Sequence, residues 1–220
     1  HSVFRTDSLI MDINSKSGLY PLLAAYNIYR NRLEAAKEKY GEFSNAFSMQ
    51  LWDLTIEQNI LVVCKTPMAR SITRRTLVGF RDTEVHAEYY KNLIENISQN
   101  PDLVVNTLRD GKYFWGINSN EYMTIDAIIG NPPYQVTVAK ADTDNGQKRS
   151  SSIFQHFQTI SDRLARYTAL IYPGGRWIHR SGKGMEQFGL EQINDPHLIQ
   201  LHYFPNSADI FKDVAIADGI

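Results

Sequence analysis

The chain has 220 residues, of which 43% are hydrophobic and 21% are charged, and its formal net charge is −1. This composition excludes an intrinsically disordered chain. The balanced charge excludes a strongly basic protein, so any contact with nucleic acid must use local basic patches. The one cysteine, Cys64, excludes an internal disulfide framework and is consistent with a reducing cytoplasm. No apolar run is long enough to predict a membrane span, and the first residues lack the pattern of a signal peptide.

The first half of the chain alternates short apolar runs with stretches in which apolar residues fall at helical spacing. Apolar runs of this length predict buried strands, whereas helical spacing with a proline in the first turn predicts helices. The expected strands are residues 8–13 and 59–65, and the expected helices follow Pro21, cover Ala46–Gln58, open at Pro67 and extend over 84–108 with a break near Pro101.

The apolar run Ile125–Gly130 has no polar alternation, which predicts a strand that is buried on both faces, as in a parallel sheet. It stops at Asn131, Pro132, Pro133 and Tyr134. The prolines lack backbone donors, so the strand cannot continue, and the first of them pushes the preceding residue toward an extended conformation. Four side chains are therefore displayed rigidly at the carboxyl end of a strand.

Beyond this turn, the polar segment Ala139–Ser152 predicts a mobile loop. It is followed by an expected helix at 153–165, a strand at 167–173, a helix at Met185–Asn194 and a strand at 198–205. Alternating strands and helices predict an α/β fold with a doubly wound, mostly parallel sheet. We expect one domain over residues 1–220, in a fragment of a longer protein, because the chain begins at His1 without a methionine.

Two strand ends are candidate sites, because open α/β sheets bind ligands beyond the carboxyl ends of their strands. Residues 12–18 form a loop of small residues before a helix, whose amides suit a carboxylate or a phosphate. Asn131 and the Pro132 carbonyl offer hydrogen-bonding groups that suit an exocyclic amine, and Tyr134 can stack on a flat ring. The structural alternatives are a capped helix N-terminus for the loop and an ordinary turn for the second strand end.

The stretch "IDAIIGNPPYQ" (125–135) closely resembles motif IV of the adenine-specific DNA methyltransferases, in particular the methylase domain of type II restriction-modification enzymes. The resemblance implies that Asn131, Pro132 and Tyr134 hold a flipped adenine while S-adenosylmethionine donates a methyl group to its amino nitrogen. It implies that Pro133 shapes the turn. It further implies the seven-stranded sheet of the S-adenosylmethionine-dependent methyltransferases.

The stretch "LIMDINSKSG" (9–18) is similar to motif I of the same family, the loop that holds the cofactor. Ile13 and Lys16 stand where that loop usually has a proline and its first glycine. The strand 59–65 carries Cys64 where the family usually has an acidic residue for the cofactor's ribose. The resemblance assigns cofactor binding to Asp12, Asn14, Ser17, Gly18, Cys64 and Asn131.

Further departures from the family pattern concern acidic residues. Thr66 occupies a second position that is often acidic, and the nearest candidates for the acidic residue of motif III are Asn118 and Asn120. A thiol is a poor substitute for a carboxylate acceptor, and Cys64 can also be a buried small hydrophobic residue.

The resemblance implies double-stranded DNA as a partner, with a target-recognition domain, and a nuclease in some systems, outside residues 1–220. We expect contacts with the DNA backbone from Lys148, Arg149, Arg176, His179, Arg180 and Lys183. The run Lys65, Arg70, Arg74, Arg75 and Arg81 is typical of a solvated helix face, with phosphate contact as the alternative. The histidines show no spacing that predicts a zinc site.

Two other hypotheses remain open. The same four-residue motif also occurs in methyltransferases that act on adenine in RNA and on protein glutamine, since a planar amide and an adenine amine present similar chemistry. A second hypothesis is a degenerate, non-enzymatic DNA-binding module that no longer binds cofactor, which is favoured by Lys16, Cys64 and Thr66. The stretches 167–188 and 198–220 are similar to the corresponding segments of the restriction-modification methylases. This similarity favours the restriction-modification methylase of DNA adenine, in the cytoplasm, as the prediction.

Overall fold

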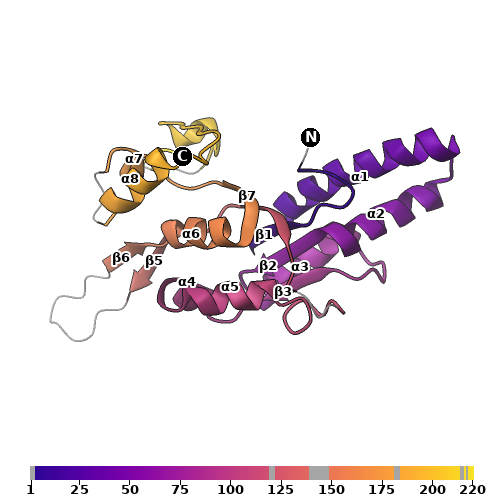
Figure 1. Cartoon of the computed structure of the whole chain (residues 1–220), viewed down its shortest axis with the longest axis horizontal. Helices are drawn as coiled ribbons and strands as arrows, with labels where there is room; N and C mark the ends of the chain where they lie inside the picture. The colour runs from indigo at the N-terminus through magenta and orange to yellow at the C-terminus, as the bar shows by residue number, and fades with distance from the viewer. Residues whose placement is uncertain (1–2, 119–121, 139–148, 181–183, 214–215, 217) are drawn as a thin grey trace. The chain divides into compact units, whose positions relative to one another are not determined.

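Figure 1 shows the structure of the chain, a computed structural model that describes residues 3–118, 122–138, 149–180, 184–213, 216 and 218–220. The chain forms two compact units. The first unit comprises residues 1–132 and 156–170, and the second comprises residues 133–155 and 171–220.

The first unit is built on a parallel sheet of five strands in the order β3-β2-β1-β4-β7. The strands are β1 (Ile10–Ser15), β2 (Ile60–Cys64), β3 (His86–Tyr89), β4 (Ile125–Gly130) and β7 (Ala165–Leu170). All residues of β1 and β2 are buried, as expected for strands covered on both faces. The predicted parallel α/β sheet is therefore confirmed, but it has five strands in the described residues and not seven.

The strand order reverses next to β1. The chain runs from β1 to β2 and β3 on one side, and then crosses to the other side of β1 to form β4 and β7. In register, Asp12 of β1 lies opposite Val62 of β2 and opposite Ile129 of β4. The carboxyl ends of β1 and β4 consequently meet at the point of reversal, which is where open α/β sheets bind ligands.

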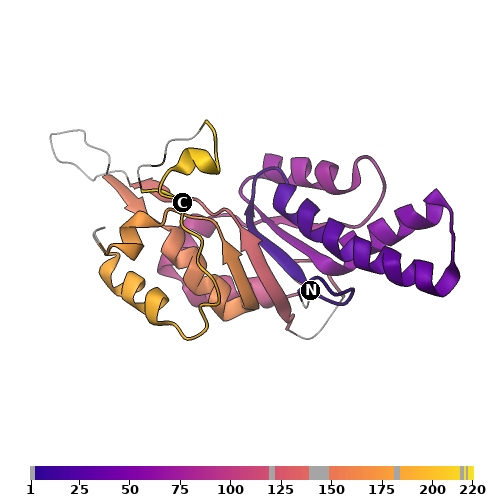
Figure 2. The same cartoon turned by 90° about the horizontal axis from the view of Figure 1, so that it is seen from above.

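Six helices belong to the connections between these strands: α1 (Leu19–Tyr40), α2 (Asn45–Asn59), α3 (Pro67–Val78), α4 (Leu93–Gln99), α5 (Pro101–Arg109) and α6 (Phe154–Leu164). Right-handed crossovers place α1 to α3 on one face of the sheet and α4 to α6 on the other, because the direction of strand addition changes after β3. Figure 2 shows the strands between the indigo and purple helices of one face and the magenta and orange helices of the other. Ala25, Ile56 and Leu77 from α1, α2 and α3 share one core cluster with Val62 of β2.

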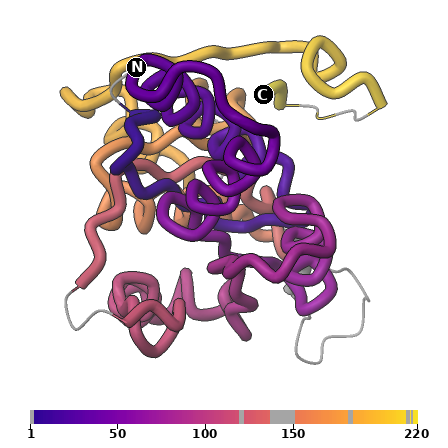
Figure 3. Tube along the Cα trace, turned by 90° about the vertical axis from the view of Figure 1, so that its right-hand side faces the viewer, coloured from indigo at the N-terminus to yellow at the C-terminus, as the bar shows by residue number. Residues whose placement is uncertain are grey.

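Helices α1 and α2 pack along each other, and the end where they join faces the viewer in Figure 3. Arg32 of α1 donates to the carbonyl of Thr6 and to Asn59 Oδ1 at the end of α2. Asn59 Nδ2 in turn donates to the carbonyl of Ser8, at 2.7 Å. This network holds the segment that leads into β1, and it thereby helps to set the register of β1 against the neighbouring strands.

The second unit contains an antiparallel hairpin, β5 (Gln135–Val138) with β6 (Arg149–Ser152), together with α7 (Gly175–Ile178), α8 (Glu186–Asn194) and a short 3-10 helix, η1 (Ser207–Asp209). Its core is aromatic. Phe154 stacks on Tyr172 with 4.8 Å between ring centroids, and Trp177 and Phe188 pack against the same cluster.

Two predicted elements are wrong. Residues 84–108 begin with β3, because pairing with β2 outweighs the helical spacing of the apolar residues there; the helical remainder and its break at Pro101 are confirmed. Residues 198–205 form no strand, and Ile199 is 83% exposed, although Phe204 exchanges both backbone hydrogen bonds with Ile220. An apolar run forms a strand only where the edge of a neighbouring strand is available for backbone hydrogen bonds.

The other predicted elements are confirmed to within a few residues, from the strand at 8–13 to the helix over Met185–Asn194. Residues 149–152, expected in a loop, form β6, and the rest of that expected loop, 139–148, lies outside the described residues. None of the helices that the structure describes is long and apolar enough to cross a membrane.

Thr66 has a structural role that can be tested. Its side chain caps α3 by accepting the backbone N–H of Ala69 at 3.0 Å. We expect Thr66→Ala to lower the free energy of unfolding by about 1 kcal/mol, and Thr66→Asp to preserve it, because aspartate is an equally good N-cap. Urea denaturation of the two variants measures the difference. Equal stability of the alanine and aspartate variants would contradict the capping role.

Candidate functional site

Asp12 lies near the end of the central strand β1 and is only 1% exposed. Its Oδ1 accepts the backbone N–H of Asn14 at 3.3 Å, and the hydroxyl of Ser15 hydrogen-bonds its carboxylate. Its Oδ2 has no hydrogen-bond partner within the described part of the chain. Burial raises the pKa of Asp12 from 3.8 to about 7, because desolvation outweighs these two hydrogen bonds.

The strand carries a bulge directly after Asp12. Between Asp12 and Ser15, β1 advances three residues while β2 advances two, from Val62 to Cys64. Such bulges re-aim side chains and are common beside active sites. The extra length leaves the amide of Asn14 buried, with neither of its polar side-chain atoms hydrogen-bonded to any described residue. A buried amide of this kind costs about 1–3 kcal/mol and calls for a partner from outside the chain, such as water or a ligand.

The loop after β1 is held tightly against α3. Gly18 has the left-handed φ of 79° and donates its N–H to Ser15 Oγ at 3.1 Å. A Cβ at this position would lie 3.1 Å from the Thr73 backbone, so both the conformation and the tight space favour glycine. The carbonyl of Ser17 accepts a hydrogen bond from the Thr76 hydroxyl at 2.7 Å.

Helix α1 starts at Leu19 without a side-chain cap, since Gly18 has no side chain to offer. Pro21 has no backbone N–H to satisfy, and within the described residues no acceptor binds the N–H groups of Leu19 and Tyr20, which are left for solvent or a ligand. Together with the positive end of the helix dipole, these donors favour an anionic group such as a carboxylate at this loop.

The turn after β4 approaches the same point. Gly130 has a φ of 155°, and a Cβ there would lie 3.1 Å from Asp12 Oδ1, so the end of β4 lies directly beside the carboxylate. Asn131 is half-buried and Pro132 is buried. Burial raises the pKa of the Tyr20 phenol, on the first turn of α1, and both Asn131 and Asp12 lie near enough to act on that pKa. Asp12, Tyr20 and Asn131 thus form one group, which we call the β1–β4 cluster.

The sequence did not single out Tyr20, which lies two residues beyond the quoted stretch 9–18. In the sequence it is a tyrosine two residues after Gly18. This position indicates no function until the neighbouring strand is known.

Pro133 and Tyr134, also predicted to be catalytic, belong to the second unit and follow Pro132 directly in the chain. Both are half-buried. The carbonyl of Tyr134 accepts the N–H of Ile153 at 3.1 Å, just beyond the last residue of β6.

Cys64 ends β2 and is fully buried in the core cluster under α3. Burial raises the pKa of its thiol to about 12, so the thiol is protonated near neutral pH. Glu88, near the end of the adjacent strand β3, is close enough to act on that thiol and forms an ion pair with Arg70 at 2.8 Å. This carboxylate was missed because its segment was assigned to a helix. Asn118, one of the expected substitutes, is exposed, and Asn120 lies outside the described residues.

The basic residues near α3 are mostly bound within the protein. Arg70 also donates to the carbonyl of Ala87, and Arg81 pairs with Asp53 at 2.8 Å. Arg74 and Arg75 donate to the carbonyls of Val85 and Gly79. These contacts favour the structural interpretation of this run.

The basic residues expected to meet DNA lie in the second unit or outside the described residues. Arg176 pairs with Asp218, whereas His179 and Arg180 are exposed. The Arg149 backbone belongs to β6. Lys148 and Lys183 fall outside the residues that the structure describes.

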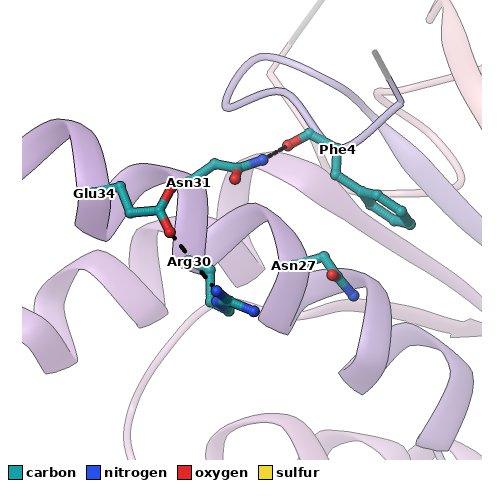
Figure 4. A pocket seen from close by; sticks show the side chains of 5 residues that line it. All are labelled: Phe4, Asn27, Arg30, Asn31 and Glu34. Atoms are coloured by element: carbon teal, nitrogen blue, oxygen red, sulfur yellow. Dashed lines mark hydrogen bonds and ion pairs between the residues drawn. The ribbon is translucent and has the colours of Figure 1, made fainter. Parts of the chain in front are cut away.

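A pocket of about 270 Å³ lies on α1 and contains none of the predicted site residues. Figure 4 shows Asn31 reaching the carbonyl of Phe4, at 2.6 Å, and Glu34 facing Arg30, at 3.7 Å; Asn27 also lines the pocket. Because its polar groups already bind one another, this pocket is a poor candidate for a ligand site. In the part of the chain that the structure covers, no group of three or more His, Cys, Asp or Glu could hold a metal ion.

Residues 58–211, more than two thirds of the chain, match the family described as Eco57I restriction-modification methylase. The chain belongs to the Eco57I restriction-modification methylase family. A Mycoplasma pneumoniae (strain ATCC 29342 / M129 / Subtype 1) protein named "Uncharacterized adenine-specific methylase" is 30% identical to it over 130 residues. That match covers 53% of this chain and 30% of the relative, so the chain spans less than two thirds of the relative's length.

The span matched to the Eco57I methylase family includes Cys64 and the whole turn from Asn131 to Tyr134. It does not include the loop from Asp12 to Gly18. The assignment of that loop therefore depends on the geometry of β1 and β4 and not on the family match.

The raised pKa of Asp12 gives a stability prediction. Between about pH 4 and pH 7 the folded protein binds a proton at Asp12 that the unfolded chain has lost, so the free energy of unfolding falls as pH rises. We expect wild type to lose roughly 3 kcal/mol between about pH 5 and pH 8 relative to Asp12→Asn, which carries no such proton. Urea denaturation of both proteins across this range measures the difference. Parallel pH curves would contradict it.

Proposed function

We propose that the protein is an adenine-specific DNA methyltransferase of a restriction-modification system, which transfers a methyl group from S-adenosylmethionine to the exocyclic amino nitrogen of a flipped adenine. The family membership supports the reaction class. The observation that carries the proposal is that Asn131 and Pro132 directly follow Gly130, the last residue of β4, where a Cβ would lie 3.1 Å from Asp12 Oδ1 of β1. Substrate and cofactor would then meet where the strand order reverses.

The chemistry requires accurate positioning more than a strong base. Asn131 Oδ1 and the Pro132 carbonyl are two acceptors on consecutive residues that can each take one N–H of an adenine amine. Bound in this way, the nitrogen directs its lone pair away from the ring plane toward an electrophile. Tyr134, two residues further along the chain, would stack on the base and offset part of the free energy of flipping it from the duplex.

The β1 loop has the chemistry that the cofactor needs. The open amides of Leu19 and Tyr20 suit the carboxylate of the methionine moiety. Asn14 Oδ1 and Asp12 Oδ2 are acceptors and Asn14 Nδ2 is a donor, and none of them has a partner among the described residues. The amino acid group of a bound cofactor would supply their hydrogen bonds. Ser17 and Gly18 belong to the same loop and would line the cofactor site. When bound, S-adenosylmethionine supplies an activated methyl group on a sulfonium.

The ribose hydroxyls are better matched by Glu88 than by Cys64. A carboxylate accepts two hydrogen bonds, whereas the thiol of Cys64 is fully buried and protonated. Glu88 lies one strand away, near the same edge of the sheet. Cys64 would contribute through its position at the end of β2 and not through its sulfur.

Both units together would form the catalytic domain, acting in the cytoplasm on double-stranded DNA. Selection of a DNA sequence, and cleavage where a nuclease accompanies the methylase, would depend on segments outside residues 1–220. The His179 imidazole and the Arg180 guanidinium are exposed in the second unit and are candidates for contact with the DNA backbone.

Replacement of Asn131 tests the role of the turn. We expect Asn131→Ala to lower methyl transfer by roughly a hundredfold or more, because one of the two acceptors for the amine is lost. Affinity for S-adenosylhomocysteine, measured by calorimetry, should be nearly unchanged. Asn27→Ala, which removes an exposed amide of α1, is the matched control and should retain full activity. Equal loss of transfer and affinity in Asn131→Ala would instead indicate a structural support.

The substrate is tested with labelled S-adenosylmethionine and the full-length protein on unmethylated genomic DNA, on RNA and on a glutamine peptide. We expect label in DNA alone, recovered as N6-methyladenine, and none with Asn131→Ala. Label in the peptide or the RNA alone would overturn the proposed substrate. If S-adenosylhomocysteine gives no heat up to roughly millimolar concentration, the protein is the degenerate module that Lys16 and Thr66 suggest.

A further inference from the structure

We propose that Thr76 of α3 is a positioning residue for the cofactor, whose hydroxyl holds the loop after β1 in the conformation that binds S-adenosylmethionine. This inference rests on the proposed function and adds to it a residue from outside the β1–β4 cluster. The observation is a hydrogen bond between residues that are 59 positions apart in the chain: the Thr76 hydroxyl donates to the carbonyl of Ser17 at 2.7 Å.

The peptide between Ser17 and Gly18 is held at both of its polar groups. Its carbonyl accepts the Thr76 hydroxyl, and its N–H, which belongs to Gly18, donates to Ser15 Oγ at 3.1 Å. Because a trans peptide is planar, its carbonyl and its N–H point in opposite directions. One partner from α3 and one from β1 therefore fix the rotation of this peptide plane.

Without the bond to Thr76, the loop would have more conformations available. Gly18 lies at a φ of 79°, and a glycine adopts φ values of either sign at little cost. The peptide could then rotate and turn the Ser17 carbonyl away from α3, and a carbonyl oxygen that faces an anionic group at the start of α1 repels it. Cofactor binding would have to order the loop again, and the free energy of that ordering lowers the affinity.

Helix α3 presents the hydroxyl directly beside the loop. Thr73 and Thr76 are three residues apart and therefore lie on the same face of the helix. A Cβ at Gly18 would lie 3.1 Å from the Thr73 Cα and 3.3 Å from the Thr76 Cβ, so this face already packs against the loop. The hydroxyl thus reaches the Ser17 carbonyl without any rearrangement of the helix or the loop.

The basic run along α3 keeps the helix in place for this contact. Arg70 and Arg74 donate to the carbonyls of Ala87 and Val85, at 2.8 and 2.9 Å, which lie in β3 and directly before it. These bonds attach one face of α3 to the edge strand of the sheet, while Thr76 contacts the loop from a different face. The two arginines therefore support the position of the loop through α3.

The test compares Thr76→Val, Thr76→Ser and Ser71→Ala in the full-length protein. Valine keeps the branched shape of threonine without the hydroxyl, and serine keeps the hydroxyl. Ser71→Ala is the matched control, because it removes a hydroxyl that donates to Pro67 within α3 itself. We expect Thr76→Val to weaken the binding of S-adenosylhomocysteine, measured by calorimetry, roughly fivefold, which corresponds to one hydrogen bond. The other two variants should bind like wild type.

Kinetics provide a readout that a purely structural role would not produce. On unmethylated genomic DNA we expect Thr76→Val to raise the KM for S-adenosylmethionine by a factor similar to the loss of affinity. Its kcat at saturating cofactor should be unchanged, because the bound cofactor itself orders the loop. Its Tm without ligand should match that of Ser71→Ala.

The outcomes separate the two proposals. If wild type methylates DNA adenine and Thr76→Val binds S-adenosylhomocysteine as tightly as wild type, the positioning role is wrong and the proposed function stands. A loss of affinity that Thr76→Ser shares, or one that comes with equal falls in kcat and Tm, would also overturn the positioning role, because the residue would then act through packing.

Two further outcomes concern wild type. The expected loss of affinity in Thr76→Val, with a wild type that methylates no adenine, would support the positioning role and overturn the proposed function. A wild type that does not bind S-adenosylhomocysteine would overturn both.

Discussion

The site depends on one constraint, which is that β1 and β4 are parallel neighbours whose carboxyl ends meet where the strand order reverses. The contact is close: a Cβ at Gly130 would lie 3.1 Å from Asp12 Oδ1, tighter than most contacts of a real Cβ. Because the two strands are separated by more than a hundred residues in the chain, only the sheet brings Asp12 and Asn131 together. The loop after β1 and the turn after β4 therefore lie next to each other at the carboxyl edge of the sheet, which is where open α/β sheets bind ligands.

The same constraint costs stability. Asp12 and Asn14 are polar side chains buried where the chain supplies too few partners, and burial raises the pKa of Asp12 accordingly. A fold selected for stability alone would have apolar residues at these positions. This chain has such residues at Ile10 and Met11 of the same strand. Retained polar groups of this kind are expected where a ligand completes their hydrogen bonds. Ligand binding would therefore stabilise the protein by satisfying groups that folding leaves open.

The sequence predicts most of the first unit because its signals are local. The apolar runs at β1, β2 and β4 and the proline that opens α3 need no knowledge of distant partners. The strand β3 was not predicted, because its four residues become a strand only beside β2. Glu88 was missed with it, and Tyr20 was missed because its nearness to Asn131, more than a hundred residues further along the chain, arises only on folding.

Lys16 stands where the motif I loop that residues 9–18 resemble usually has a glycine, and the structure shows how the loop forms with a lysine there. Outside glycine, the described residues with a positive φ are Asn92 and Arg180, so Lys16 adopts an ordinary backbone conformation with its side chain exposed. The conformation that requires glycine falls on Gly18, which the chain keeps. A lysine at the loop surface adds a positive charge near the open end of α1, and this complements an anionic ligand group. The departure that suggested a degenerate loop is therefore compatible with a working one.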